Sequence, residues 1–428
     1  MFPKINWAAL SVAISVTAAA QTPPRLTLQE AEAMAIKNHP QVQAAQNEVN
    51  YANQQIVINR APYYPDVTAD VTGTQANDLS RIGAGDLAAA RLFDREAQGI
   101  VIRQLITDSG RTPNLVASAR LQAQAASQNS QATRYTVLLT VNRAYFDVLH
   151  AQATVKVAEQ TVAARQLLDD QVTELARNKL RSQLDVSFAD VNVSQAKLLL
   201  LRAQDSVASA LAELGRAMGS DQPANYQLAD EPLPPSPPPA TAALVTQAID
   251  NRPELASLRA SLDAAKRFAE AEKDLTRPTV SAIAVGGYTP YINVAPIPPE
   301  YEAVGANVSI PIFNGHLFTA RREAAYQRAL EADQRLRDQQ QQISRDVHVA
   351  WASATDAYQR IDVTAQFLRQ ASLAMQLAQG RYDLSLATIV ELTQAQLNVT
   401  QAEVENLNAK YDYQTQYSAL QYTIGLLR

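Results

Sequence analysis

Cysteine is absent from this sequence of 428 residues. A disulfide framework, a thiolate metal site and an anchor through an acylated cysteine are therefore excluded. The four histidines lie far apart, without the spacing of metal ligands: His39, His150, His316 and His348. We interpret each of them as a surface or packing residue. Since no glycine-rich phosphate motif opens a helix either, we expect no enzyme activity, no metal and no cofactor.

Positive charge and long apolar runs are also scarce. The formal net charge is −5 and the basic residues form no clustered face, which argues against nucleic acid as a partner. At the start of the chain, Lys4 precedes an apolar run that ends near Val16, and the small residues Ala18 and Ala20 suit cleavage. We therefore predict a signal peptide over residues 1–20. No later stretch approaches eighteen consecutive apolar residues, so any insertion into a membrane would require β-strands.

Glycine and proline, which interrupt helices, are missing from two long stretches. Neither residue occurs between Asn114 and Leu214, and Gly380 is the only one between His316 and Ile424. Both stretches are rich in helix-forming residues, and a seven-residue apolar register indicates coiled-coil seams. The sequence thus predicts two long helical hairpins, over 112–219 and 316–425, with turns near "RNKLRSQ" (177–183) and "GRYDLSLAT" (380–388).

Short strand-like runs precede each helical region. "VTADVTG" at 67–73 and "VGANVSIPI" at 304–312 alternate apolar with polar residues, which suits a barrel wall around a wet lumen. "GIVIRQLIT" at 99–107 and "TVSAIAVGGY" at 279–288 alternate poorly and are assigned as strands by position. We predict two β-hairpins, over about 65–108 and about 278–313.

The two halves of the chain repeat one another. "NVSQA" at 192–196 recurs as "NVTQA" at 398–402. Other matches are "NHP" at 38–40 with "NRP" at 251–253, at a spacing of 213, Gly110 with Gly315 at 205, and Gly219 with Gly425 at 206. We predict a first repeat over 21–219, a proline-rich connector over 220–242 and a second repeat over 243–428. In the pentapeptides we expect Val193 and Ala196 to occupy the seam and Asn192 to face away from its centre.

Four strands per chain cannot close a barrel, and open sheet edges are not tolerated in lipid. The chain is therefore expected to oligomerise. Two copies would give eight strands, whose interior is filled by side chains, whereas three copies give twelve strands and leave room for a passage. Two similar halves in each of three chains also give six near-equivalent helical units around one axis.

In these features the sequence resembles the TolC-type outer membrane efflux proteins. The resemblance covers nearly the whole chain after residue 20, through the ordered segments "LTLQEAEAMAIKNHPQVQAAQ", "QLITDSGR", "AYFDVLHAQ", "VSIPIFNGH" and "LQYTIGLL". It implies an α+β membrane protein: a homotrimer with a twelve-stranded barrel in outer-membrane lipid, a periplasmic tunnel of coiled-coil helical hairpins, and an equatorial region that holds the connector.

The resemblance also implies where function resides. In this family the helical tips close the periplasmic end, and the tunnel opens when an adaptor protein and an inner-membrane pump of the RND or ABC type engage it. Asp185 and Tyr382 fall where a hydrogen bond holds the tip closed, and Glu391 falls where carboxylates line the entrance. Ala387 stands where the family pattern has an arginine, so we expect a weaker gate or one held by other contacts. The expected adaptor contacts are Leu180, Arg181, Ser182, Leu386, Ala387 and Thr388.

The function we expect is a passive outer-membrane exit duct for efflux or type I secretion, without enzyme activity. An exported structural coiled-coil protein or adhesin remains the alternative. It would account for the heptads, although not for the paired β-hairpins or the repeat. For Asp185 and Glu391, a purely structural role at helix N-termini also stays open.

Overall fold

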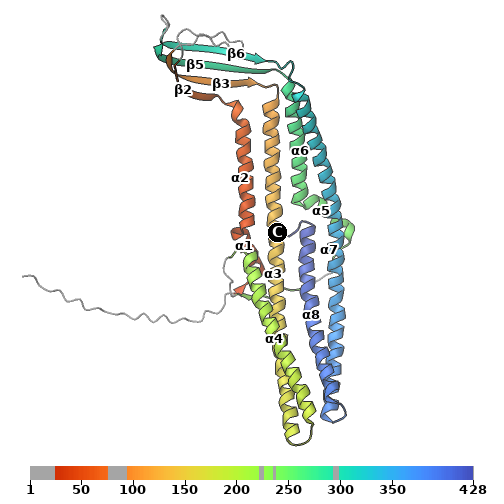
Figure 1. Ribbon diagram of the computed structural model, residues 1–428. Coiled ribbons are helices and arrows are strands. Elements are labelled where there is room, and N and C mark those ends of the chain that lie inside the picture. The colour runs from red at the N-terminus through yellow and green to blue at the C-terminus, as the bar shows by residue number, and fades with distance from the viewer. Residues whose placement is uncertain (1–24, 76–93, 221–225, 235–237, 293–297, 428) are drawn as a thin grey trace, which may run out of the picture.

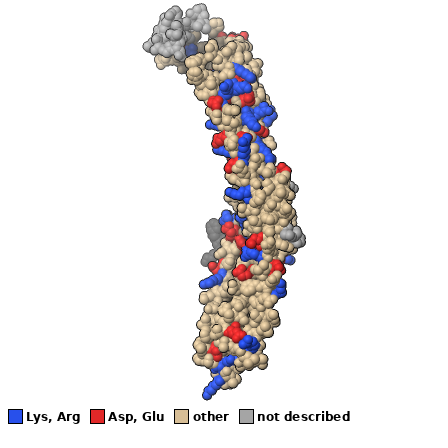
Figure 2. Space-filling model, turned by 90° about the vertical axis from the view of Figure 1, so that its right-hand side faces the viewer, with Lys and Arg blue, Asp and Glu red and all other residues tan. Residues whose placement is uncertain are grey.

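Long helices with a sheet across one end make up the chain in the computed structural model, which describes residues 25–75, 94–220, 226–234, 238–292 and 298–427 (Figure 1; seen from its right-hand side in Figure 2). The predicted signal peptide lies outside the described residues. The first half contains β1 (Arg25–Leu26), α1 (Leu28–Asn38), α2 (Pro40–Arg60), η1 (Ala61–Tyr63), β2 (Asp66–Thr74), β3 (Arg95–Thr107), α3 (Arg111–Arg177) and α4 (Gln183–Ala217). The second contains β4 (Gln227–Leu228), α5 (Thr241–Asn251), α6 (Pro253–Lys273), η2 (Asp274–Thr276), β5 (Thr279–Ile292), β6 (Glu300–Ser309), α7 (Leu317–Asp383) and α8 (Ile389–Thr423).

Corresponding helices of the two halves have equal lengths. α3 and α7 each contain 67 residues, and α4 and α8 each contain 35. α1 and α5 each contain 11 residues, and α2 and α6 each contain 21. The structure therefore relates the two halves element by element, down to the length of each helix.

The backbone corrects one detail of the predicted repeat. Residues with positive φ recur at a constant spacing of 206, as Ser109 with Gly315, Gly110 with His316, Lys179 with Ser385, and Gly219 with Gly425. The expected match of Gly110 with Gly315 is therefore wrong by one position. It followed residue identity, whereas the left-handed residue that directly precedes the long helix is Gly110 in the first half and His316 in the second.

The four long strands form one antiparallel sheet in the order β2-β3-β5-β6. Pairing of β3 with β5 joins the two halves, so the two predicted hairpins merge into a single sheet. Within the described residues, β2 and β6 are its edges. The apolar residues of these edge strands are strongly exposed: Val71 is 86% exposed and Val304 is 87% exposed.

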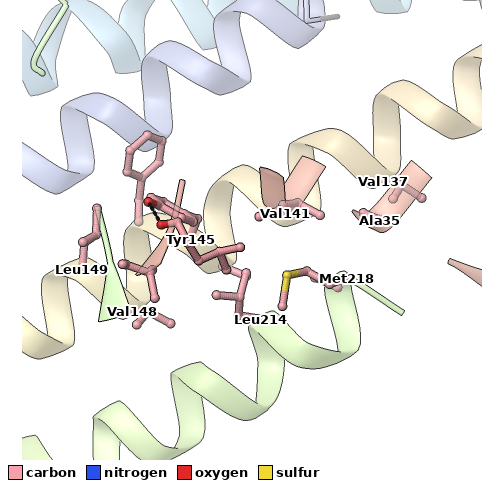
Figure 3. Close-up of a cluster of buried hydrophobic side chains, with 14 of the residues drawn as sticks. Ala35, Val137, Val141, Tyr145, Val148, Leu149, Leu214 and Met218 are labelled. Carbon is pink, nitrogen blue, oxygen red and sulfur yellow. Dashed lines mark hydrogen bonds between the residues drawn. The ribbon is translucent and has the colours of Figure 1, made fainter. Parts of the chain in front are cut away.

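The main core lies where α4 ends beside α3, about midway along the molecule in Figure 1, and its buried side chains are drawn in Figure 3. Tyr145 of α3 is fully buried there, and its hydroxyl lies 2.9 Å from the carbonyl oxygen of Leu26 and 2.7 Å from that of Ala229. Trp351 lies 206 residues further along, and its indole N–H donates to the carbonyl of Pro239 at 2.8 Å. Equivalent aromatic residues of α3 and α7 thus hold the segment that connects the halves.

None of the described helices has an apolar stretch long enough to cross a bilayer.

Candidate functional site at the hairpin tips

The first hairpin turns between α3 and α4 and is closed by a capping box. The backbone N–H of Asp185 donates to the Ser182 hydroxyl oxygen at 3.2 Å, and the N–H and O–H of Ser182 donate to the Asp185 carboxylate, each at 3.0 Å. Both side chains satisfy groups at the start of α4 that the helix leaves unpaired. The Asp185 carboxylate is therefore engaged within its own tip.

The second hairpin turns between α7 and α8 and has an N-cap but no reciprocal capping box. The backbone N–H of Glu391 donates to the Thr388 hydroxyl at 3.3 Å. The Glu391 carboxylate lies 3.6 Å from the guanidinium of Arg381, which also donates to the carbonyl of Leu386 at 3.2 Å. Because Glu391 is 44% exposed, its charge faces solvent at the base of the tip as well as this arginine.

The two tips are joined by Arg181 and Tyr382. The guanidinium carbon of Arg181 lies 4.3 Å from the centre of the Tyr382 ring, and its Nη2 donates to the Tyr382 carbonyl at 3.1 Å. A cation over an aromatic face is stabilised by about 0.5–2 kcal/mol. The ring is only 4% exposed, and burial raises the pKa of the Tyr382 hydroxyl.

This arrangement corrects the expected contact between Asp185 and Tyr382. Although both residues are described by the structure, no hydrogen bond joins them, and the buried Tyr382 hydroxyl has no partner among the described residues. The physical reason is that Asp185 is held by Ser182, while Arg181 occupies the face of the ring. The sequence Ser182–Gln183–Leu184–Asp185 carries the signature of a capping box, and that signal could have predicted the role of Asp185.

The expected adaptor contacts fall into two groups. Leu180 and Leu386 are 69% and 66% exposed, and Ser182 and Thr388 are also exposed. Ala387 is buried in an apolar cluster that includes Leu392, so the expectation that it contacts a partner is wrong. Arg181 is half-buried against Tyr382.

Above the tips, further polar contacts join the first hairpin to the second. Asn192 is 6% exposed, and its amide N–H donates to the Thr393 hydroxyl at 3.0 Å. The backbone carbonyl of Asn192 accepts from buried Arg165 at 3.0 Å. Nearer the middle of the molecule, His150 Nε2 lies 2.6 Å from Asn408 Oδ1. We call the contacts at Tyr382, Thr393 and Asn408 the tip, middle and upper rungs.

Sequence reasoning missed all three rungs. From the sequence we expected Asn192 to face away from the centre of the seam in its own hairpin. The sequence did not predict that this face of α4 packs against α8. His150 was expected to be a surface or packing residue, and it contacts the Tyr411 ring edge-on as well as Asn408. The described residues contain no group of side chains suited to hold a metal ion.

Comparison with known proteins identifies the architecture. The model of the family described as outer membrane efflux protein matches residues 33–220 and 244–426. The chain belongs to the outer membrane efflux protein family. Its two matched segments correspond to the two repeats, and the family consists of outer-membrane channels rather than enzymes.

Two characterised relatives illustrate this family. The alkaline protease secretion protein AprF of Pseudomonas aeruginosa is 26% identical over 415 residues, which cover 92% of this chain and 83% of AprF. The outer membrane protein TolC of Salmonella enteritidis is 21% identical over 407 residues, which cover 91% of this chain and 80% of TolC.

Solved structures of similar fold support the same classification. The outer membrane protein VceC of Vibrio cholerae superimposes with a TM-score of 0.79 at 19% identity, covering 93% of this chain and 96% of VceC. A membrane protein of Pseudomonas aeruginosa gives a TM-score of 0.81 at 20% identity, with 93% of each chain covered. The predicted fold class is thereby confirmed. The family match confirms the outer-membrane location with the helical part in the periplasm.

Proposed function

We propose that three copies of this outer membrane efflux protein form the passive exit duct of a tripartite efflux pump or a type I secretion system, with a gate at the helical tips. The observation that carries the proposal is the open sheet. β3 of the first half pairs with β5 of the second, while β2 and β6 are edges within the described residues. Applying the repeat once more pairs β6 of one copy with β2 of the next, and repeated pairing closes a barrel.

The upper helices support the same ring. α6 packs between α3 and α7, whereas α2 packs on α3. The repeat therefore predicts that α2 packs against α7 of a neighbouring copy. In agreement, α2 leaves large apolar side chains exposed: Tyr51 at 59%, Val57 at 60% and Ile58 at 59%. Such a row of exposed apolar side chains is typical of an interface.

Three copies fit the geometry best. A barrel of eight strands has an interior filled by side chains, while twelve strands leave an aqueous passage. At the opposite end, three Glu391 carboxylates would form a ring of negative charge that attracts cations. Exposed Leu180 and Leu386 project from the tips, where a periplasmic adaptor and an inner-membrane pump would engage them.

Purified protein in a planar bilayer tests the proposal. We expect trimers by native mass spectrometry, extraction only by detergent, and ion conductance. The alternative, an exported coiled-coil protein without a channel, predicts release by salt or urea and no conductance. A chain that is released in this way and does not conduct would refute the exit duct.

A further inference from the structure

The repeat relates contacts inside one chain to contacts between copies. The rungs join the first hairpin to the second hairpin of the same chain. In a closed ring, the second hairpin of one copy also meets the first hairpin of the next. The residues at that seam are found by shifting each rung by 206 positions, the spacing that relates the long helices throughout. This step rests on the ring of copies proposed above.

At the seam between copies, the residues that correspond to the upper rung carry opposite charges. His150 corresponds to Asp356 and Asn408 corresponds to Arg202. Both charged side chains are exposed, and neither forms an ion pair with any residue that the structure describes. Their positions on α7 and α4 therefore leave a carboxylate and a guanidinium free to meet across the seam.

The middle rung keeps its chemistry. Asn192 corresponds to Asn398, and Thr393 corresponds to Ser187. The pair within one chain is an amide and a hydroxyl, and the corresponding pair between copies is again an amide and a hydroxyl. Ser187 is exposed, and its hydroxyl donates within its own helix to the Gln183 carbonyl at 3.2 Å, which leaves the oxygen able to accept.

The tip rung has no counterpart. Arg181 corresponds to Ala387, and Tyr382 corresponds to Ala176. Two alanines supply neither the cation nor the ring, so the contact that joins the tips within one copy is missing between copies.

An exposed apolar residue on α7 supports the packing of a second copy against this helix. Phe367 is 40% exposed, whereas its counterpart Thr161 on α3 is covered and only 7% exposed.

We propose that the seam between copies is held by an Arg202–Asp356 ion pair and an Asn398–Ser187 hydrogen bond and lacks a latch at the tip. The partner is a second copy of this chain. The tips consequently separate between copies more readily than within a copy, and the gate opens along these seams.

Cysteine cross-linking tests the seam in a chain that has no cysteine of its own. Ser187→Cys combined with Asn398→Cys should give covalent dimers and trimers on a non-reducing gel after mild oxidation. The matched control, Asn192→Cys with Thr393→Cys, should give a bridge within one chain and no oligomer. Trimers that form by native mass spectrometry but give no covalent oligomer would overturn the seam and leave the exit duct standing. Absence of trimers would overturn both.

Charge reversal provides a second test. Arg202→Glu and Asp356→Arg should each lower the fraction of trimer that survives mild urea by about fivefold, in line with exposed ion pairs and their like-charge counterparts. The double variant should restore it. Losses that simply add in the double variant would overturn the ion pair.

The position of gate opening is tested with the same cysteine variants. Bridging Ser187→Cys to Asn398→Cys should lower conductance in a planar bilayer, and a reducing agent should restore it. The Asn192→Cys, Thr393→Cys bridge within one copy should leave conductance unchanged. Equal conductance before and after reduction of the seam bridge would overturn opening along the seams.

Discussion

Removal of the Tyr145 hydroxyl tests how the connector between the repeats is held. This hydroxyl lies within hydrogen-bond distance of the Leu26 and Ala229 carbonyls inside the main core. In Tyr145→Phe the Ala229 carbonyl loses this donor, and the Leu26 carbonyl keeps the Ala229 N–H, while the ring still fills its space. Leaving a buried polar group unsatisfied costs about 1–3 kcal/mol. Local opening of the connector should therefore become about 5- to 150-fold more frequent.

Hydrogen exchange at the amide of Ala229 measures this opening. That N–H donates to the Leu26 carbonyl at 2.9 Å, so its exchange requires the pairing of β1 with β4 to break. A matched control is Tyr135→Phe, because the Tyr135 hydroxyl accepts from Gln131 on an exposed face of α3. If Tyr145→Phe leaves exchange at Ala229 as slow as the control does, the hydroxyl does not hold the connector and the reasoning is refuted.

The same hydroxyl predicts a pH dependence. Burial raises the pKa of Tyr145 to about 12, above its ordinary value near 10. The folded state thus favours the neutral phenol, whose stabilisation is complete below about pH 10 and is lost as the pH rises towards 12. Two pKa units correspond to about 2.7 kcal/mol. Fluorescence of Trp351, which is bonded to the connector at Pro239, should change over this range in the wild type and not in Tyr145→Phe.

Three further substitutions have defined outcomes. Arg181→Gln removes the cation from the Tyr382 ring and should loosen the contact between the two tips of one copy, seen as faster hydrogen exchange at the amide of Leu386, whereas unchanged exchange would show that Arg181 does not hold the tips together. Arg321→Ala leaves the buried Glu272 carboxylate, which Arg321 contacts at 2.6 Å, with Arg111 at 3.6 Å and should cost about 1–3 kcal/mol, seen as a lower midpoint in urea; an unchanged midpoint would contradict this. Burial lowers the pKa of His39, whose Nδ1 caps α2, so its neutral form stabilises the fold above about pH 6.5 and this contribution is lost as the pH falls below that value. His39→Asn, which retains a capping group that does not titrate, should remove that acid sensitivity in a urea titration at several pH values.

Much of the fold follows from residues that are rare. Since glycine and proline are nearly missing from the two long stretches, the sequence predicts both helical hairpins and the turns between them. The repeat was predicted from matching segments such as "NHP" and "NRP". Its spacing of 206 in the long helices was predicted from the two pentapeptides and from Gly219 with Gly425, whereas at the start of the long helices Gly315 attracted the match that the backbone gives to His316.

The candidate site was less predictable, because its contacts join residues about 200 positions apart. Arg181 donates a hydrogen bond to Tyr382, and Asn192 donates one to Thr393. Both contacts depend on how the two hairpins lie side by side. Nothing local marks such a pair, since an arginine in a turn and an asparagine in a helix are equally compatible with solvent. The engagement of Asp185 is different, because its capping partner is three residues away and could have been found from the sequence.

The unequal lengths of neighbouring helices have a mechanical consequence. α3 and α7 run without interruption for 67 residues, which is about 100 Å, whereas α4 and α8 end near the middle and α2 and α6 accompany the upper parts. The interrupted helices meet at that level in the main core, where the end of α4 packs with α1 and α2. Among the described helices, α3 and α7 are the ones that run without a break from the tips to the sheet, so they give each chain two continuous elements that can carry a displacement at the tips to the sheet.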